Sequence, residues 1–178
     1  MRTRMVSSEA LYVDEPIVKI CRDDLARLIP AATKNERRRM RLCAHPSVDD
    51  PLHEMLIVLA KDAYVRPHKH LHKSESFHVL EGQADIVIFE EDGSIRDVIP
   101  MGEYASGACF YYRLADACYH GLVVRSEVFA YHETTGGPLD RAQTVFAPWS
   151  PAEDALALRA AFVAQLNENL KTRWRNSL

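Results

Sequence analysis

The sequence lacks long apolar runs. Nowhere in its 178 residues does an uninterrupted hydrophobic stretch approach the ~20 residues that a membrane span requires. Residues 1–16 include arginines, but no apolar segment follows them as it does in a secretory signal peptide. We therefore expect a soluble, cytoplasmic protein with no membrane partner.

Cysteine pairs are also missing. The chain has 4 cysteines, and no two of them stand in a CxxC arrangement. Such scatter argues against a disulfide framework and against a structural zinc knuckle, and it suits a reducing compartment. We expect Cys21, Cys43, Cys109 and Cys118 to be buried, unreactive thiols.

Neither sign of charge is in large excess. The chain has 22 Lys and Arg against 25 Asp and Glu, which gives a formal net charge of -3. Proteins that bind nucleic acid use clustered Lys and Arg to neutralise phosphates. No nucleic-acid partner is therefore expected, and any site for an anionic small molecule has to be local.

The middle of the chain is rich in residues that favour strands. Val, Ile, Phe and Tyr dominate short runs separated by turn residues, a pattern typical of a β-barrel or β-sandwich. The predicted strands are residues 54–60, 76–81, 84–90, 95–101, 108–114, 119–124 and 127–134. Asp92 and Gly93 predict a tight hairpin between 85–89 and 95–99, and Gly82 predicts a second tight turn or a bulge.

The two ends of the chain differ from the middle. A short helix is expected over residues 22–32. Near the other end, Ser150, Pro151 and Glu153 have the pattern of a helix cap, a first-turn proline and a capping-box glutamate. The helix that they predict carries an apolar stripe, which should dock on the barrel or on a partner subunit. The stripe comprises Leu156, Ala160, Val163, Leu170 and Trp174.

Length argues for one domain with a single hydrophobic core. Within it we expect an N-terminal extension (residues 1–50), a barrel (51–148) and a C-terminal helix (149–178).

The residues most indicative of chemistry lie between Pro67 and Gly82. In a strand, residues two apart share a face, so His68 and His70 would present two imidazoles to one point. Glu75 follows after a turn and could return a carboxylate to the same point. Such a set of ligands suits one divalent transition metal, namely Zn, Fe, Mn, Ni or Co.

This stretch resembles the first motif of the cupin superfamily, in which HxH is followed by a glutamate and then a glycine. His68, His70, Glu75 and Gly82 have the spacing of that motif. The resemblance implies an all-β cupin fold, a double-stranded β-helix or jelly-roll barrel. The short N-terminal helical segment and the C-terminal helix would then lie outside the barrel.

The resemblance also implies one more histidine ligand from a later strand. His120 is the residue that can fill this place, although Ala115, Ala117 and Val124 depart from the motif's usual flanking residues. His72 is the main competitor for the fourth ligand position. We expect it to lie in a loop, because the chain has to turn before it reaches the glutamate.

A closer resemblance is to the WbuC-like cupin metalloproteins, small bacterial proteins often encoded with surface-polysaccharide genes. It is carried by residues 64–70, 75–82, 137–138 and 146–151, with the arginine-rich 37–41 and His45. It implies a link to polysaccharide biosynthesis and, as in many cupins, a homodimer. It does not define a reaction, because a fold does not determine a function.

Arginines supply the candidates for anion recognition. Arg66 shares a strand face with the two histidines of the motif, so its guanidinium could bind a substrate carboxylate or phosphate, with Tyr64 as a weaker candidate. A salt bridge that only stabilises the barrel mouth is the alternative role for Arg66. Arg37, Arg39 and Arg41 alternate along one strand face and could form either a solvated edge or an anion clamp.

Two functions fit this set of residues. The first is an enzyme in which the metal keeps positions open for a sugar-derived or carboxylic-acid substrate, with Tyr112 and Glu133 as candidate catalytic residues. Isomerase, epimerase, hydrolase and dioxygenase activities all remain open. The second is a non-catalytic module that binds or senses a small ligand, which could be an anion. A purely structural metal is disfavoured, because arginine and tyrosine residues accompany the ligands.

Overall fold

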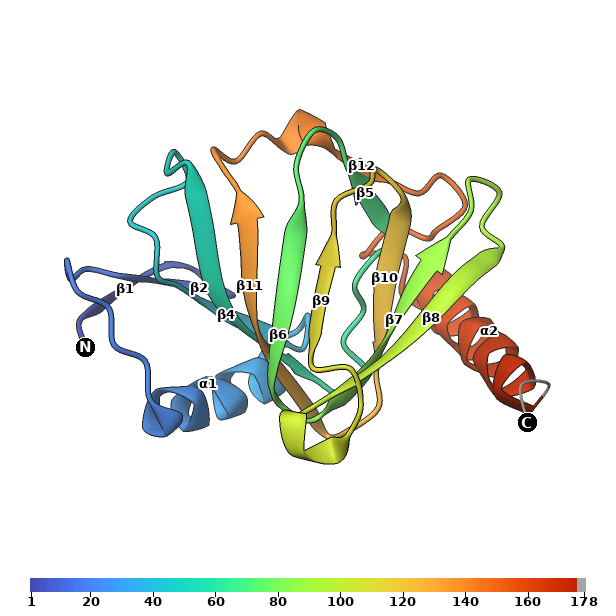
Figure 1. The fold of residues 1–178 in the computed structure, drawn as a ribbon, viewed down its shortest axis with the longest axis horizontal. Helices are drawn as coiled ribbons and strands as arrows, with labels where there is room; N and C mark the ends of the chain where they lie inside the picture. Colours follow the sequence, from blue (N-terminus) through green and yellow to red (C-terminus); the bar gives the residue numbers. More distant parts are fainter. Residues whose placement is uncertain (176–178) are drawn as a thin grey trace.

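The computed structural model describes residues 1–175, with the side chains of residues 1–172. In this part of the chain the strands form two facing sheets (Figure 1). The first has the order β1-β2-β3-β4-β11-β6-β9 and the second has the order β12-β5-β10-β7-β8. The strands of the first sheet are β1 (Thr3–Ser7), β2 (Ala10–Val13), β3 (Arg39–Cys43), β4 (Leu52–Ala60), β6 (Glu75–Glu81), β9 (Tyr111–Leu114) and β11 (Val128–Gly136). Those of the second are β5 (His68–His70), β7 (Gln83–Phe89), β8 (Ile95–Gly102), β10 (Tyr119–Val124) and β12 (Thr144–Phe146).

The strands from β4 to β11 pair concentrically. β7 pairs with β8, β6 with β9, β5 with β10 and β4 with β11, each time antiparallel. A segment that pairs its first strand with its last in this way, and rolls into two facing sheets, is a jelly roll. The predicted all-β jelly-roll fold, with one helix near each end of the chain, is therefore confirmed.

Two glycines make the turns that the sequence indicates. Phe89 pairs with Ile95 across the β7–β8 hairpin, where Gly93 has a φ of 88°. Gly82, with a φ of 82°, connects β6 to β7 and so carries the chain from one sheet to the other. A Cβ at this position would lie 1.9 Å from the carbonyl oxygen of Val128, so only glycine fits. One predicted strand is shorter than expected: β9 begins at Tyr111 rather than at residue 108.

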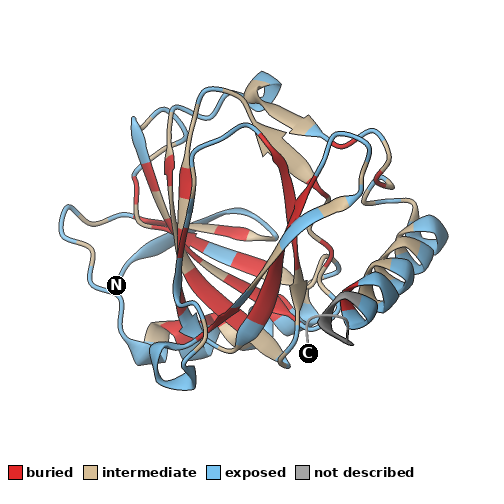
Figure 2. Ribbon diagram, turned by 45° about the vertical axis from the view of Figure 1, so that its right-hand side comes forward, coloured by how far each residue is buried: buried red, intermediate tan, exposed pale blue. Residues whose placement is uncertain are grey.

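The side chains that point between the sheets change character along β6, β10 and β11. Phe77, Val79, Ile86, Leu122, Phe129 and Tyr131 form an apolar end, packed into one hydrophobic cluster that both sheets share. His68, His70, Glu75, His120 and Glu133 form a polar end that lines a cavity. Buried residues are concentrated in the strands (Figure 2), including outward-facing ones that the two helices cover.

The N-terminal helix α1 (Arg22–Lys34) packs against the outer face of the first sheet. Its Leu25, Leu28 and Ala32 recur at helical spacing and are buried against residues of β3 and β4. At its start, the backbone N–H of Cys21 donates to the carboxylate of Asp24 at 3.0 Å, which satisfies a donor at the helix end. The expected helix over 22–32 is confirmed and is slightly longer.

The C-terminal helix α2 (Leu156–Arg175) begins later than predicted. Ser150 does not cap it, because the Ser150 hydroxyl donates to the carbonyl of Ala147 and accepts from Arg66. Glu153 is likewise not a capping residue, since it forms ion pairs with Arg37 and Arg39.

The docking of α2 on the barrel is confirmed in part. Leu170 is fully buried and Val163 is half-buried, whereas Leu156 is 64% exposed, contrary to expectation. Leu166 and Leu170 pack against β7, β10 and Trp149. The side chain of Trp174 lies outside the described residues. None of the described helices is both long and apolar enough to cross a membrane.

Candidate metal centre

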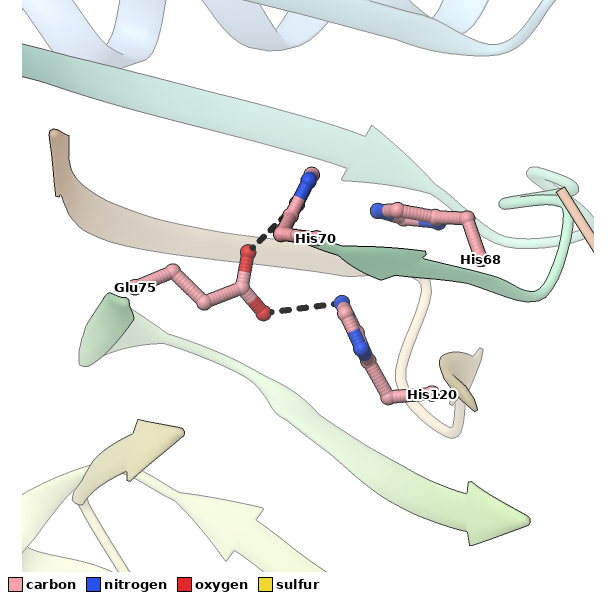
Figure 3. Close-up of side chains that lie close together, drawn as sticks. All are labelled: His68, His70, Glu75 and His120. Carbon is pink, nitrogen blue, oxygen red and sulfur yellow. Dashed lines mark ion pairs between the residues drawn. The ribbon is translucent and has the colours of Figure 1, made fainter. Parts of the chain in front are cut away.

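Four side chains from three strands converge inside the polar end (Figure 3). His68 and His70 lie on one face of β5, and His120 on β10 is the direct partner of His68 across the sheet. Glu75 is the first residue of β6 and approaches from the facing sheet. The candidate ligand atoms of the four all lie within 4.8 Å of one another.

His72 does not join this cluster. It is exposed and has a φ of 62°, so it occupies the turn between β5 and β6. The predicted choice of His120 over His72 therefore agrees with the geometry.

Hydrogen bonds to Nδ1 orient each imidazole. Nδ1 of His68 lies 2.8 Å from the carbonyl oxygen of Arg66, and Nδ1 of His120 lies 3.1 Å from that of Cys118. A carbonyl oxygen can only accept, so the proton of each neutral ring sits on Nδ1 and the lone pair of Nε2 faces the cluster. Nδ1 of His70 lies 3.2 Å from the hydroxyl of Thr144. Such oxygen partners orient the metal-binding histidines of many proteins.

Two buried atoms in the cluster are unsatisfied by the described chain. Oε1 of Glu75 and Nε2 of His120 are 2.9 Å apart and form an ion pair when His120 is protonated, but when its ring is neutral, with the proton on Nδ1, neither atom has a hydrogen-bond partner. Oε2 of Glu75 lies 3.3 Å from Nε2 of His70. Buried polar atoms are almost always paired, so two such atoms facing each other call for a third partner.

A divalent metal would satisfy both atoms. Two ligand atoms at ~2.1 Å from one ion and at right angles to each other are about 3 Å apart, which is close to the separations found here. Three imidazoles and one carboxylate form a donor set typical of Zn, Fe, Mn, Ni or Co. The residues present therefore fit a transition-metal site.

At His68 and Glu75, but not at His120, the electrostatic environment favours the protonation state that binds a metal. Burial, with the nearby His120 second, lowers the pKa of His68 to about 4, so its ring is neutral at pH 7. Burial would raise the pKa of Glu75, but His120 and His70 outweigh it and hold the pKa below its usual range. The pKa of His120 is raised, since the attraction of Glu75 exceeds the effect of burial. Protons therefore compete with a metal mainly at His120.

The cluster forms part of the wall of a cavity of about 220 Å³. Further basic, acidic and histidine side chains line this cavity, namely Arg41, His45, His53, Lys73 and Glu133. Burial, and secondly the charge of Glu75, raise the pKa of the Glu133 carboxyl to about 8. In the metal-free protein Glu133 therefore favours its protonated form at neutral pH, inside the cavity and near the candidate ligands.

Tyr112, the other candidate catalytic residue, lies in the apolar cluster and is not among the residues that line the cavity. Its ring is 5.5 Å from that of Phe77, and its buried hydroxyl has no hydrogen-bond partner in the described chain. Burial, with Glu75 second, raises its pKa. Tyr112 is thus a core residue beside Glu75.

Arg66 does not point where strand phase predicts. Its Nε donates to the hydroxyl of Ser150 at 3.0 Å and its Nη2 donates to the carbonyl of Ser150 at 3.1 Å. The guanidinium lies over the ring of Phe146, 4.8 Å from its centroid. The predicted orientation toward the metal cluster is wrong, because a residue far along the chain provides these donors with acceptors.

Tyr64 is also directed away from the cluster. Its hydroxyl donates to the carbonyl of Pro151 at 2.9 Å. Its ring lines a different cavity, of about 240 Å³, between α2 and the barrel. The walls of that cavity are largely apolar, with Phe162, Val163 and Leu166 among them, and they contain none of the four candidate ligands.

Lys73 and His53 also line the metal-side cavity, although neither was predicted from the sequence. His53 stacks on His45 with ring centroids 4.1 Å apart, and its Nε2 lies 3.2 Å from the carbonyl of Val48. Lys73 lies in the turn that precedes Glu75. Its position two residues before the predicted ligand Glu75 is the signal that could have found it.

Comparisons with known proteins were made for the whole sequence and the structure. A family model described as "Domain of unknown function (DUF6016)" matches residues 20–101. No curated protein matches the sequence. Among solved structures, protein SO0799 from Shewanella oneidensis is similar, with 14% identity and a TM-score of 0.47 over 68% of this chain and 75% of that chain.

Two further solved structures align with a smaller part of the chain. Oxalate decarboxylase from Bacillus subtilis has 17% identity and a TM-score of 0.44 over 56% of this chain and 24% of that chain. The Schizosaccharomyces pombe Cnp3 cupin domain has 11% identity and a TM-score of 0.44 over 56% of this chain and 64% of that chain. At these levels of identity and TM-score, the likeness says nothing about the activity of this chain. Its own strand order, and the HxH, glutamate and histidine side chains that meet inside the barrel, give it the cupin fold.

Proposed function

We propose that this protein is a metal-dependent enzyme that acts on a small polar molecule bound at the polar end of the barrel. The observation that carries the proposal is the pair of unsatisfied buried atoms, Oε1 of Glu75 and Nε2 of His120, which face each other within a cluster of four candidate ligands. A bound metal would supply Lewis-acid polarisation of a substrate oxygen or, with a redox metal, activation of oxygen.

The size of the cavity favours a small substrate. Its volume of about 220 Å³ corresponds to roughly seven water molecules, since each occupies ~30 Å³ in the liquid. A small carboxylic acid fits inside, whereas a nucleotide sugar would have to leave most of its atoms in solvent. Of the two substrate classes compatible with the sequence, the small acid is the better supported.

Glu133 is the residue placed to exchange a proton with such a substrate. It lines the cavity together with the candidate ligands and is protonated at neutral pH. Its carboxyl group can therefore donate a proton to a substrate oxygen and take it back in a later step. Replacing Glu133 by Gln keeps the shape and removes this proton exchange, so it should abolish turnover while substrate binding persists.

A non-catalytic binding module is the second candidate function. It is favoured by the placement of Tyr112 in the core and by the engagement of Arg66 with Ser150, which leave Glu133 as the one predicted acid–base residue on the cavity wall. Equal ligand binding by wild type and Glu133→Gln, with no turnover of any metal-and-acid combination by wild type, would establish this alternative.

We also propose that the protein is WbuC-like, homodimeric and linked to surface-polysaccharide biosynthesis. The support is the set of sequence motifs at residues 64–70, 75–82 and 146–151. Sedimentation of the purified protein tests the homodimer.

Metal analysis tests the main proposal. Protein purified without an affinity tag should contain about one equivalent of a divalent transition metal by elemental mass spectrometry. His70→Ala should reduce the content to traces without loss of the circular-dichroism signal of the barrel. His72→Ala is the matched control, since it removes an exposed histidine two residues away and should leave the metal content unchanged. Equal metal content in both variants would refute the site.

A further inference from the structure

The arginines of residues 37–41 differ in whether a carboxylate pairs with them. Glu9 accepts ion pairs from both Arg37 (3.3 Å) and Arg39 (2.6 Å). Glu153 pairs with the same two arginines. The charges of Arg37 and Arg39 are thus balanced by two carboxylates and serve to join distant parts of the chain.

Arg41, the next residue on the same face of β3, has no such partner. Within the described residues, no hydrogen bond or ion pair engages its side chain. It lines both the metal-side cavity and an adjoining cavity of about 150 Å³. Arg41 is an exposed residue, and its guanidinium therefore lies at the cavity mouth without a partner from the described chain.

Lys73 is a second unpaired cation on the same cavity wall. It is half-buried, and in the described part of the chain its ammonium group makes neither an ion pair nor a hydrogen bond. Arg41 and Lys73 both act electrostatically on Glu133, where they oppose the rise of its pKa, so both charges lie near the same carboxyl group. Some other cations, such as Lys61, Lys69 and Arg125, each pair with a carboxylate.

The balance of charge in the cavity favours an anion. A divalent metal brings two positive charges, and Arg41 and Lys73 bring one each. Glu75 offsets one of these four, and even an ionised Glu133 would offset only one more. At least two positive charges then remain for a ligand to neutralise.

From this arrangement we propose that Arg41 and Lys73 form an anion subsite that binds a carboxylate group of a small organic acid beside the metal. Arginine offers the planar pair of donors that matches a carboxylate, and the ammonium of Lys73 adds a point charge. The subsite rests on the proposed function, and it names the substrate class: a small acid with a carboxylate for the two cations and a further oxygen within reach of the metal cluster.

The test is a binding titration with defined acids. Malonate, lactate and succinate are titrated by calorimetry into Mn(II)-loaded wild type, with malonamide as the uncharged analogue and inorganic phosphate as the alternative anion. At least one of the acids should bind, and malonamide should not. Arg41→Gln and Lys73→Gln should each weaken that acid's affinity roughly tenfold or more, since each removes a charge-assisted contact. Their metal content should stay at the wild-type value.

Arg27→Gln is the matched control. It removes the same charge from an exposed position on α1, outside the cavity, and should bind the acid as wild type does. Equal affinity in wild type, Arg41→Gln and Lys73→Gln would overturn the subsite. So would the binding of phosphate alone, or of none of the acids.

A titration of metal-free protein separates this proposal from the metal proposal. The loss of affinity caused by Arg41→Gln should persist there, although all affinities are lower. If wild type bound no metal, the proposed function would fail, while this metal-free comparison would still decide whether the two cations bind the acid.

Discussion

At the apolar end of the barrel, aromatic rings pack against one another. The ring of Tyr131 lies 4.5 Å from that of Phe77 and 5.2 Å from that of Phe129, in tilted arrangements that aromatic pairs prefer. A few residues away on the same strands, at the polar end, Glu75 and His120 bury atoms that no protein group satisfies. Packing therefore stabilises one end, whereas burying unpaired polar atoms costs stability at the other, and the proposed metal would offset this cost.

The contrast shows how a jelly roll separates stability from chemistry without a second domain. Inward-facing residues recur at every second position of a strand. A polar residue two positions away from an apolar one therefore lies in the functional site instead of the hydrophobic core. Altering one end should therefore leave the other largely intact, and variants at each end can test this separation.

Phe129→Ala should have the largest effect on stability. Phe129 is fully buried in the apolar cluster, and truncating such a ring costs about 3–5 kcal/mol through lost burial and the cavity left behind. Urea denaturation should show this loss, whereas the folded variant should bind metal with wild-type stoichiometry. A loss of metal binding at temperatures where the variant is folded would show that the two ends are coupled.

Metal binding at the polar end should raise the stability of the folded protein. A free metal concentration one hundred times the dissociation constant stabilises the folded state by about 2.7 kcal/mol, provided that only this state binds. Thermal unfolding of metal-free and metal-loaded wild type should show the shift. In Glu75→Gln, which lacks the ligand charge, the transition should not move on addition of metal; an equal shift would place the metal elsewhere.

Arg66→Lys should have a smaller effect, confined to stability. Lysine keeps the charge but loses the paired donors that hold Ser150, so we expect a loss of about 1–2 kcal/mol in denaturant unfolding. Metal content should not change. If the affinity for a small acid fell and stability did not, the contacts with Ser150 would not be the role of Arg66.

Asp24→Ala should have the smallest effect, because it lies outside both ends, at the start of α1. The backbone N–H of Cys21 holds the pKa of Asp24 below its ordinary value. The folded state thus prefers the ionised carboxyl, so its contribution is present above pH ~4 and is lost as the pH falls through the lowered pKa. At neutral pH the variant should lose up to about 1 kcal/mol. The difference from wild type should disappear in acid; a difference that persists there would have another cause.

The features set by local spacing were predictable. His68, His70 and Glu75 could be assigned because strand alternation and one turn determine their meeting point, and the β7–β8 hairpin because Asp92 and Gly93 determine its turn. His120 required a family resemblance, since nothing local links it to the first motif.

The features set by distant contacts were not predictable. The polar atoms of Arg66 are taken by Ser150, and Glu153 is drawn from a helix cap to Arg37 and Arg39. Strands β1 and β2 also went unpredicted. β1 is exposed along its whole length and so has no alternation between buried and exposed residues to reveal it.

The concentric pairing of the strands has a consequence for the order of assembly. The β7–β8 hairpin can close locally, but each strand pair outside it joins segments that are farther apart in the chain. The last pair, β4 with β11, can form only after β11 has been synthesised. During synthesis on the ribosome, His68, His70 and Glu75 emerge well before His120. A nascent chain without His120 has only three of the four candidate ligands, so the candidate metal site is complete only when the roll closes.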